Sequence, residues 1–335
     1  MRGNGKTYFY EKNKSVIFAY IMMLCVFVLY VVSQPNFFSA YGIKSTFDQF
    51  QPLTYAALAQ TLVILTGGVD LSVGASIGVA NCIAATYMVP LGDTLGSPLL
   101  GIVAVSVLTL LSGLVMGLFN GLIIVKGRIQ PMVVTLATSF VFTGIGLYIR
   151  PTSGGEVYSE FAMLARYVPG TKIPMGILWL LFAFVCIWLP VRRSRFGQSV
   201  YAIGGNEASA YASGIDVERT KLKVYIFSGV VCSLGGLILT AFNQSGSATG
   251  CDSATMNAVA ASVLGGTSLT GGKGGYTGTI AGIIIYSLIL GLLIFWGVNA
   301  YYQSLFKGAI LIIAVAINML DRISFRKKED GEYAG

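Results

Sequence analysis

The segment TGGVDLSVG, residues Thr66–Gly74, joins two apolar runs in the first quarter of the chain. An ionised carboxylate at the middle of a membrane-spanning helix costs about 2.5 to 3.5 kcal/mol on insertion scales, so Asp70 is not expected at the centre of a span. The glycines beside it permit a tight turn. The segment therefore predicts a hairpin at a membrane surface, with an apolar helix on each side.

The composition around this hairpin is that of a membrane protein. Of the 335 residues, 55% are hydrophobic and 11% are charged, whereas a soluble domain has about 25% charged residues. About 20 apolar residues cross a bilayer as a helix. We predict an all-α polytopic membrane protein, one transmembrane domain over residues 1–335. Its ten candidate spans lie at residues 16–33, 50–67, 71–90, 98–125, 131–150, 173–190, 222–243, 256–269, 276–297 and 303–320.

The positions of lysine and arginine predict the orientation. With a cytoplasmic N-terminus, 17 of the 22 basic residues fall on the cytoplasmic side of ten spans, as the positive-inside rule requires. Both termini are then cytoplasmic, and the cytoplasmic parts are residues 1–15, a loop at 191–222 and a tail at 321–335. Topology and contact with anionic membrane lipid account for the net charge of +8, so nucleic-acid binding is not needed.

Residues for catalysis and metal binding are missing from the sequence. It has no histidine, and its five cysteines are widely spaced, so neither a metal site nor a nucleophile–histidine pair is expected. The segment TSLTGGKGG, residues 267–275, lacks the first glycine and the Ser or Thr of a phosphate-binding loop. We therefore expect no enzyme activity and no cofactor in this chain.

The loop at 191–222 contains NEASAYASGI, residues 206–215. Asn206 is a suitable N-cap, Glu207 falls in the first turn and Gly214 is a suitable end, so the segment predicts a short helix. Two roles fit such a helix between basic stretches. It docks a cytoplasmic partner, or it anchors the loop to lipid headgroups.

The opening hairpin has an echo further along the chain. LTGGVDLSVG and VLGGTSLTGG share glycines and a hydroxyl residue at an offset of 198 residues, and Ser268 stands where Asp70 stands in the first copy. A shared need for a tight turn with a capped helix explains the match. For Asp70, capping, a salt bridge to a basic inner residue and contact with a substrate all stay open. The hairpin residues singled out here are Gly67, Gly68, Asp70, Ser72 and Gly74, with Gly265, Gly266 and Ser268 in the echo.

Four segments together resemble the permease subunit of bacterial ABC importers for simple sugars, of the ribose and galactose type. They are GGVDLSVG (67–74), NGLIIVKGRIQPMVVTLAT (120–138), RFGQSVYAIGGNEASAYASGI (195–215) and AVAASVLGGTSLTGGKGGYTGT (258–279). The resemblance implies a multi-pass protein of the bacterial cytoplasmic (inner) membrane, with a fold similar to the vitamin B12 importer's permease. In one place the chain departs from the pattern, because Thr255, Met256 and Asn257 replace an acidic stretch that is frequent in related permeases.

The resemblance also implies partners. A cytoplasmic ABC ATPase subunit binds ATP and Mg²⁺, an extracytoplasmic sugar-binding protein delivers the substrate, and a second copy of the permease or a sister permease completes the membrane part. The short helix of the cytoplasmic loop becomes the element that couples to the ATPase. The residues that this assigns to coupling are Asn206, Glu207, Ala208, Tyr211, Gly214 and Ile215.

A sugar path needs hydrogen-bonding side chains within or beside the spans. The candidates are Asn120, Thr135, Asn243, Gln244 and Asn257. The alternative for each is a hydrogen bond between helices, worth about 0.6 to 2 kcal/mol. The sequence leaves open whether the sugar is a pentose, a hexose or a related derivative.

Two other function classes are weighed against the importer permease. An ion-coupled secondary transporter of a small polar solute often has several intramembrane acids or a histidine relay, but here Asp70 is the only acid clearly flanked by spans. An intramembrane enzyme or assembly factor is disfavoured because the sequence has no histidine, no cysteine pair and no paired carboxylates. The predicted function is the transmembrane subunit of an ATP-driven sugar importer.

Overall fold

The computed structural model of the chain describes residues 5–312 and residue 316. Within these residues the regular elements are helices, joined by turns and two isolated β-bridges. The predicted tail at 321–335 lies outside the described residues. The elements are α1 Gly5–Ser33, α2 Ala40–Leu65, α3 Val73–Leu95, α4 Pro98–Gly127, α5 Pro131–Ile149, α6 Ser159–Ala162, η1 Met163–Ala165, α7 Met175–Phe182, η2 Ala183–Trp188, α8 Leu189–Arg193, α9 Arg195–Gly205, α10 Glu207–Ala212, α11 Val217–Asn243, α12 Ala254–Leu264 and α13 Tyr276–Phe295.

Within the described residues, seven helical segments are long and apolar enough to cross a membrane. They correspond to seven of the ten predicted spans, and one of them, Met175–Arg193, runs through α7, the π-helical segment η2 and α8. The fold is therefore an all-α polytopic membrane protein. The three remaining candidates are helical too, in α2, α12 and residues 300–312, but α12 has only 11 residues and residues 313–315 and 317–320 are outside the described part.

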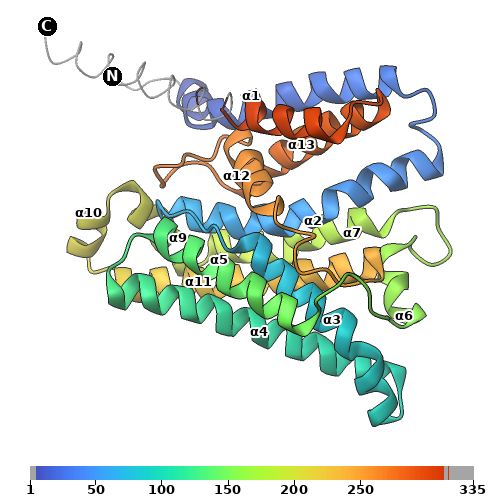
Figure 1. Cartoon of the computed structure of the whole chain (residues 1–335). Coiled ribbons are helices and arrows are strands. Elements are labelled where there is room, and N and C mark those ends of the chain that lie inside the picture. The colour runs from blue at the N-terminus through green and yellow to red at the C-terminus, as the bar shows by residue number, and fades with distance from the viewer. Residues whose placement is uncertain (1–4, 313–315, 317–335) are drawn as a thin grey trace, which may run out of the picture.

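Helix α2 occupies the centre of the bundle (Figure 1). It packs against α7, α11, α12 and α13, and nearly every residue from 50 to 65 is buried. Because protein rather than lipid surrounds α2, it tolerates polar residues that a lipid-facing span avoids. Thr61 Oγ1 lies 2.9 Å from Thr279 Oγ1 of α13, and the Tyr276 hydroxyl donates to the Thr54 carbonyl at 3.1 Å.

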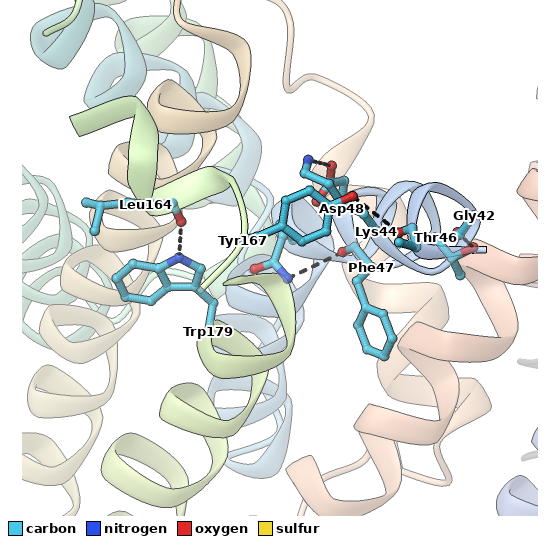
Figure 2. Close-up of polar contacts among 10 residues, drawn as sticks. Gly42, Lys44, Thr46, Phe47, Asp48, Leu164, Tyr167 and Trp179 are labelled. Carbon is cyan, nitrogen blue, oxygen red and sulfur yellow. Dashed lines mark hydrogen bonds and ion pairs between the residues drawn. The ribbon is translucent and has the colours of Figure 1, made fainter. Parts of the chain in front are cut away.

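Helix α2 also begins ten residues before the predicted span. Ser39 caps it by accepting a hydrogen bond from Gly42 N at 3.0 Å, and an ion pair between Lys44 and Asp48 stabilises the early turns. These charged turns precede the apolar run (Figure 2). A prediction from hydrophobicity alone therefore started the helix at residue 50, whereas α2 begins at Ala40.

The segments predicted to be cytoplasmic gather at one end of the bundle. Gly272 N donates to the Leu65 carbonyl at 3.0 Å, which joins the α12–α13 hairpin to the α2–α3 hairpin. At the same end, Arg192 Nη1 donates to Thr277 Oγ1 at 3.1 Å, and α9 and α10 lie beside these hairpins (Figure 1).

The segments predicted to be extracytoplasmic gather at the opposite end. Gly154 and Gly246 form a β-bridge between the loop after α5 and the loop after α11. Arg150 Nε donates to Thr86 Oγ1 at 2.9 Å, and the Tyr167 hydroxyl donates to the Ala40 carbonyl at 3.3 Å. The fold thus separates the two sets of loops, and which end faces the cytoplasm stays a prediction of the positive-inside rule.

This arrangement predicts which side of the membrane reaches each loop. A membrane-impermeant thiol reagent added to intact cells should label Lys172→Cys, which is exposed in the loop before α7, and should not label Ser213→Cys, which follows α10. Permeabilised cells should label both variants, with the unsubstituted chain as the control for its own cysteines. Labelling of Ser213→Cys in intact cells would contradict the orientation.

Candidate functional site

Helices α9 and α10 form a helical platform at the end of the bundle that is predicted to be cytoplasmic. The Ser194 side chain caps α9 by accepting from Gly197 N at 3.1 Å. Asn206 ends α9 and begins α10, where its Oδ1 accepts from Ser209 N at 2.8 Å. Gly214 adopts the left-handed conformation with φ of 80°, and Ile215 N returns to the Ala210 carbonyl at 3.1 Å. The predicted short helix, its N-cap and its glycine end are therefore confirmed.

One side of α10 packs against the rest of the chain, on a cluster that we call its seat, and the other side is exposed. Ala210 is buried in a small cluster with Ile203 and Val217. Ile215, which the sequence assigned to the coupling surface, is partly buried against this cluster and so belongs to the seat. Tyr211 is 74% exposed. The other exposed members are Asn206, Glu207, Ala208 and Gly214.

The platform contacts both glycine hairpins, the one between α2 and α3 and the one between α12 and α13. The Tyr201 hydroxyl of α9 donates to the Gly274 carbonyl at 2.8 Å. A Cβ at Gly204 would overlap the Leu65 carbonyl oxygen and the Gly272 nitrogen, so only glycine permits this approach. Sequence reasoning did not single out Tyr201 or Gly204. The signal in the sequence for this close approach was the glycine pair directly before Asn206, Gly204 and Gly205.

Asp70 lies at the junction of three helices. The side chain is 4% exposed. Its Oδ1 accepts from the Ser72 backbone N–H at 2.9 Å and from the Ser72 hydroxyl at 2.6 Å, and its Oδ2 accepts from the Ser228 hydroxyl of α11 at 3.2 Å. Asn120 Nδ2 of α4 donates to Ser72 Oγ at 2.9 Å. The carboxylate thus fixes the start of α3 against α4 and α11.

The contacts of Asp70 combine a local cap with bonds between helices. Ser72 is the N-cap residue of α3, but its hydroxyl donates to Asp70 and makes no cap hydrogen bond of its own. Among the described residues, no ion pair joins Asp70 to a base. Burial raises the pKa of the Asp70 carboxyl above its ordinary range, and the hydrogen bonds from Ser72 and Ser228 oppose that rise.

The echo repeats the turn but not the helix start. Ser268 Oγ accepts from Thr270 N at 3.4 Å and pairs with Thr270 Oγ1 at 2.9 Å, as Asp70 does with Ser72. Yet α13 begins only at Tyr276, so the expectation that Ser268 caps a helix is wrong. In each hairpin one glycine adopts the left-handed conformation after the preceding helix, Gly67 in the first and Gly266 in the second. The sequence match pairs Gly67 with Gly265, so the structural equivalence is shifted by one residue.

The other two glycines of the first hairpin make close contacts with neighbouring helices. Gly68 lies beside the Tyr225 hydroxyl, and Gly74 N donates to Thr255 Oγ1 at 2.8 Å.

The five predicted path residues divide into two groups. Asn120 and Thr135 make hydrogen bonds between and within helices, since Thr135 Oγ1 accepts from Leu71 N at 2.9 Å and donates to the Pro131 carbonyl at 2.9 Å. Asn243 and Asn257 both line a cavity of about 420 Å³ in the half of the bundle that is predicted to be extracytoplasmic. Gln244, with φ of 51°, is exposed at the end of α11.

The hydrogen bonds at Asp70 predict how its variants behave. Asp70→Asn keeps an acceptor for the Ser72 N–H and should lower thermal stability little. Asp70→Leu leaves the buried donors of Ser72 and Ser228 without an acceptor and should cost about 1 to 3 kcal/mol. Thermal unfolding of the detergent-solubilised protein measures both. An Asp70→Asn protein that is fully folded but inactive would show instead that the charge itself is required.

Comparisons with known proteins agree with the architecture. Residues 42–315 match the family described as branched-chain amino acid transport system / permease component. The ribose import permease protein RbsC of Bacillus subtilis (strain 168) is 36% identical over 307 residues, which cover 90% of each chain. The RbsC protein of Escherichia coli (strain K12) is 33% identical over 94% of this chain and 97% of its own. The galactose/methyl galactoside import permease protein MglC of Escherichia coli (strain K12) is 32% identical over 92% and 95%.

No solved structure matches the chain. The family match spans most of the chain, and the relatives align with it almost from end to end. The chain therefore belongs to this family of membrane transport permeases.

Proposed function

We propose that the chain is the transmembrane subunit of an ATP-driven importer and forms the translocation path for a simple sugar, a pentose, a hexose or a related derivative. Its relatives are named as import permeases for ribose and for galactose or methyl galactoside, which supports this substrate class. The structural observation that carries the proposal is the exposed α10 on its seat, because a permease without a motor of its own needs a surface on which an ATPase acts.

The partners follow from this role. A cytoplasmic ABC ATPase subunit binds ATP and Mg²⁺ and contacts the exposed face of α10. An extracytoplasmic sugar-binding protein docks at the opposite end, and a second permease copy or a sister permease completes the path within the inner membrane. We further propose that α2, α12 and the helix beginning at residue 300 cross the membrane together with the seven long apolar spans, in a ten-span fold of the vitamin B12 importer type.

The contacts of α9 and α10 suggest how force reaches the spans. Helix α10 has few contacts beyond its seat, whereas α9 holds both glycine hairpins through Tyr201 and Gly204. A displacement of the platform therefore moves the two glycine hairpins. One hairpin joins α2 to α3, and the other joins α12 to α13. Helix α11 begins at Val217, just beyond the seat, and carries Ser228 to the Asp70 carboxylate. The polar junction thus moves with the platform.

Tyr211 tests the coupling surface. Tyr211→Ala should leave the fold and the membrane insertion intact, because the side chain is largely exposed, and should lower sugar-dependent ATP hydrolysis and uptake at least tenfold if Tyr211 fills a hollow on the ATPase. Co-purification of the ATPase and uptake in reconstituted vesicles measure the effect. Glu207→Arg should also uncouple transport.

Lys221→Gln provides the matched control. It removes the Lys221–Glu207 ion pair of 2.7 Å without altering the exposed face of α10, and a surface ion pair of this kind is worth about 0 to 1 kcal/mol. Its uptake should stay close to that of the unsubstituted chain. If Tyr211→Ala and Glu207→Arg each couple ATP hydrolysis to uptake normally, α10 is not part of the ATPase interface.

A further inference from the structure

Three elements of the chain meet at Thr277, near the end of the bundle that is predicted to be cytoplasmic. Thr277 lies in the first turn of α13, which runs beside α1 (Figure 1). Its carbonyl accepts a hydrogen bond from the Tyr20 hydroxyl of α1 at 2.9 Å, and its Oγ1 accepts from Arg192 Nη1 of α8 at 3.1 Å. We call this meeting point of α1, α8 and α13 the Thr277 junction.

The two spans that bring α1 and α8 to the junction have mostly apolar, exposed surfaces. Only 11% of the apolar window of the span Lys14–Ser33 is buried inside the chain, and only 17% of that of the span Met175–Arg193. Phe18 and Ile21 are exposed on the first, and Leu181 and Val185 on the second. Exposed apolar surface on a membrane-spanning helix is suited to lipid contact. The junction therefore lies where lipid-facing surfaces reach the headgroups.

Basic side chains lie on the elements that form the junction. Arg192 and Arg193 are the last residues of α8, and Arg195 begins α9. Lys14 precedes Tyr20 on α1. All four basic residues are exposed, and we call them the basic patch. Because they lie at the ends of apolar spans, their charged groups can reach headgroup level, and tyrosine is typical of the same level.

The basic patch has no acidic partner within the described part of the chain. No ion pair there includes one of its four members. Three other basic residues at the same end are neutralised by neighbouring carboxylates, so their charge is already used. These pairs are Lys126–Glu218, Arg219–Asp216 and Lys221–Glu207. The patch therefore keeps its positive charge for a partner outside the chain.

An anionic phospholipid has the chemistry that this surface lacks. Guanidinium groups form charge-assisted hydrogen bonds with phosphate oxygens. The acyl chains of the same molecule can lie along the exposed apolar residues of the two spans. A zwitterionic lipid carries the same phosphate, but its own cationic group is repelled by the patch, so the net negative charge of the headgroup decides the preference.

We propose that the basic patch binds the headgroup phosphate of an anionic phospholipid in the inner leaflet, beside the Thr277 junction. The bound lipid stabilises the contact between α1, α8 and α13 directly before α9, the first helix of the platform. The leaflet rests on the predicted orientation, whereas the binding itself is independent of which solute the chain transports.

Thermal unfolding of the detergent-solubilised full chain tests this proposal. Added dioleoyl phosphatidylglycerol should raise the unfolding midpoint by about 3 °C or more, because a ligand that binds the folded state stabilises it. Dioleoyl phosphatidylcholine, which has the same acyl chains and no net charge, should raise it by less than half as much. The double variant Arg193→Gln, Arg195→Gln should lose this difference between the two lipids. Both side chains are exposed, so its midpoint without added lipid should match that of the unsubstituted chain.

The double variant Arg128→Gln, Lys223→Gln is the matched control. Both residues are exposed, lie at the same end of the bundle and take part in no ion pair among the described residues. They belong to the end of α4 and to α11 rather than to the Thr277 junction. The control should keep the full response to phosphatidylglycerol. The variant Arg193→Lys, Arg195→Lys keeps the charge and should keep most of the response.

Native mass spectrometry provides a second measurement on the same proteins. The fraction of chain that carries phosphatidylglycerol, followed over a range of lipid concentrations, gives the apparent affinity. Removal of both arginines should weaken this affinity by about tenfold or more, since each basic residue near an anionic lipid surface adds to the attraction. The matched control should bind phosphatidylglycerol as the unsubstituted chain does.

Several outcomes would overturn the proposal. Equal stabilisation by the two lipids would show that the headgroup charge is not recognised, and an equal loss of response in the matched control would show that the patch is not the site. A shift reproduced by inorganic phosphate at the same concentration would identify a free-anion site instead. If phosphatidylglycerol has no effect while Arg193→Gln, Arg195→Gln abolishes co-purification of the ATPase, the patch belongs to the ATPase interface. None of these measurements uses sugar uptake, so the proposed import function is tested separately.

Discussion

The polar character of α2 constrains the rest of the molecule. This helix carries Gln51, Thr54, Gln60 and Thr61, all of them buried. Lipid tails offer such side chains no hydrogen-bond partner, whereas inside the bundle Gln51 Nε2 donates to the Gly176 carbonyl at 2.7 Å and Thr61 Oγ1 lies 2.9 Å from Thr279 Oγ1. The Gln60 amide is buried with no hydrogen-bond partner among the described residues. The chain encloses α2 within α7, α11, α12 and α13, and the exposed apolar residues lie on the surrounding helices. Enclosure requires close contacts, which explains the small and hydroxylated residues where α2 meets α12 and α13.

Polar groups lie at two levels of the bundle, and the two sets have different surroundings. Near the end predicted to be cytoplasmic, Asp70, Ser72, Asn120 and Ser228 bond to one another and tie the start of α3 to its neighbours, while the Asn120 side-chain oxygen is buried with no hydrogen-bond partner among the described residues. Nearer the opposite end, Asn243 and Asn257 line a cavity. The predicted path residues thus separate into those that hold helices together and those that border open space.

Features that depend on local chemistry were predictable from the sequence. Asn206 and Gly214 delimit α10 because capping and a left-handed turn need only neighbouring residues. Apolar length located the seven long spans for the same reason. The start of α2 escaped prediction because its first turns carry Lys44 and Asp48 rather than apolar residues.

Features that depend on which way a helix faces were not predictable. Nothing local distinguishes Asn120, which bonds to Ser72, from Asn257, which borders a cavity. The burial of Ile215 depends on Ala210 and on the start of α11, and the failure of Ser268 as a cap depends on how far away α13 begins. The cavity lined by Asn243 and Asn257 forms where α2, α3, α11, α12 and α13 meet, a junction that a single sequence does not show.

The π-helical segment Ala183–Trp188 has a mechanical consequence. It interrupts the span Met175–Arg193, which leads directly into α9. A π-helical turn holds one residue more than an α-helical turn, and each α-helical residue advances the axis by about 1.5 Å and rotates it by about 100°. Conversion of this segment to α-helix would therefore rotate Arg192 and the start of α9 relative to the first half of the span. This one-residue difference in winding lies directly before the platform formed by α9 and α10.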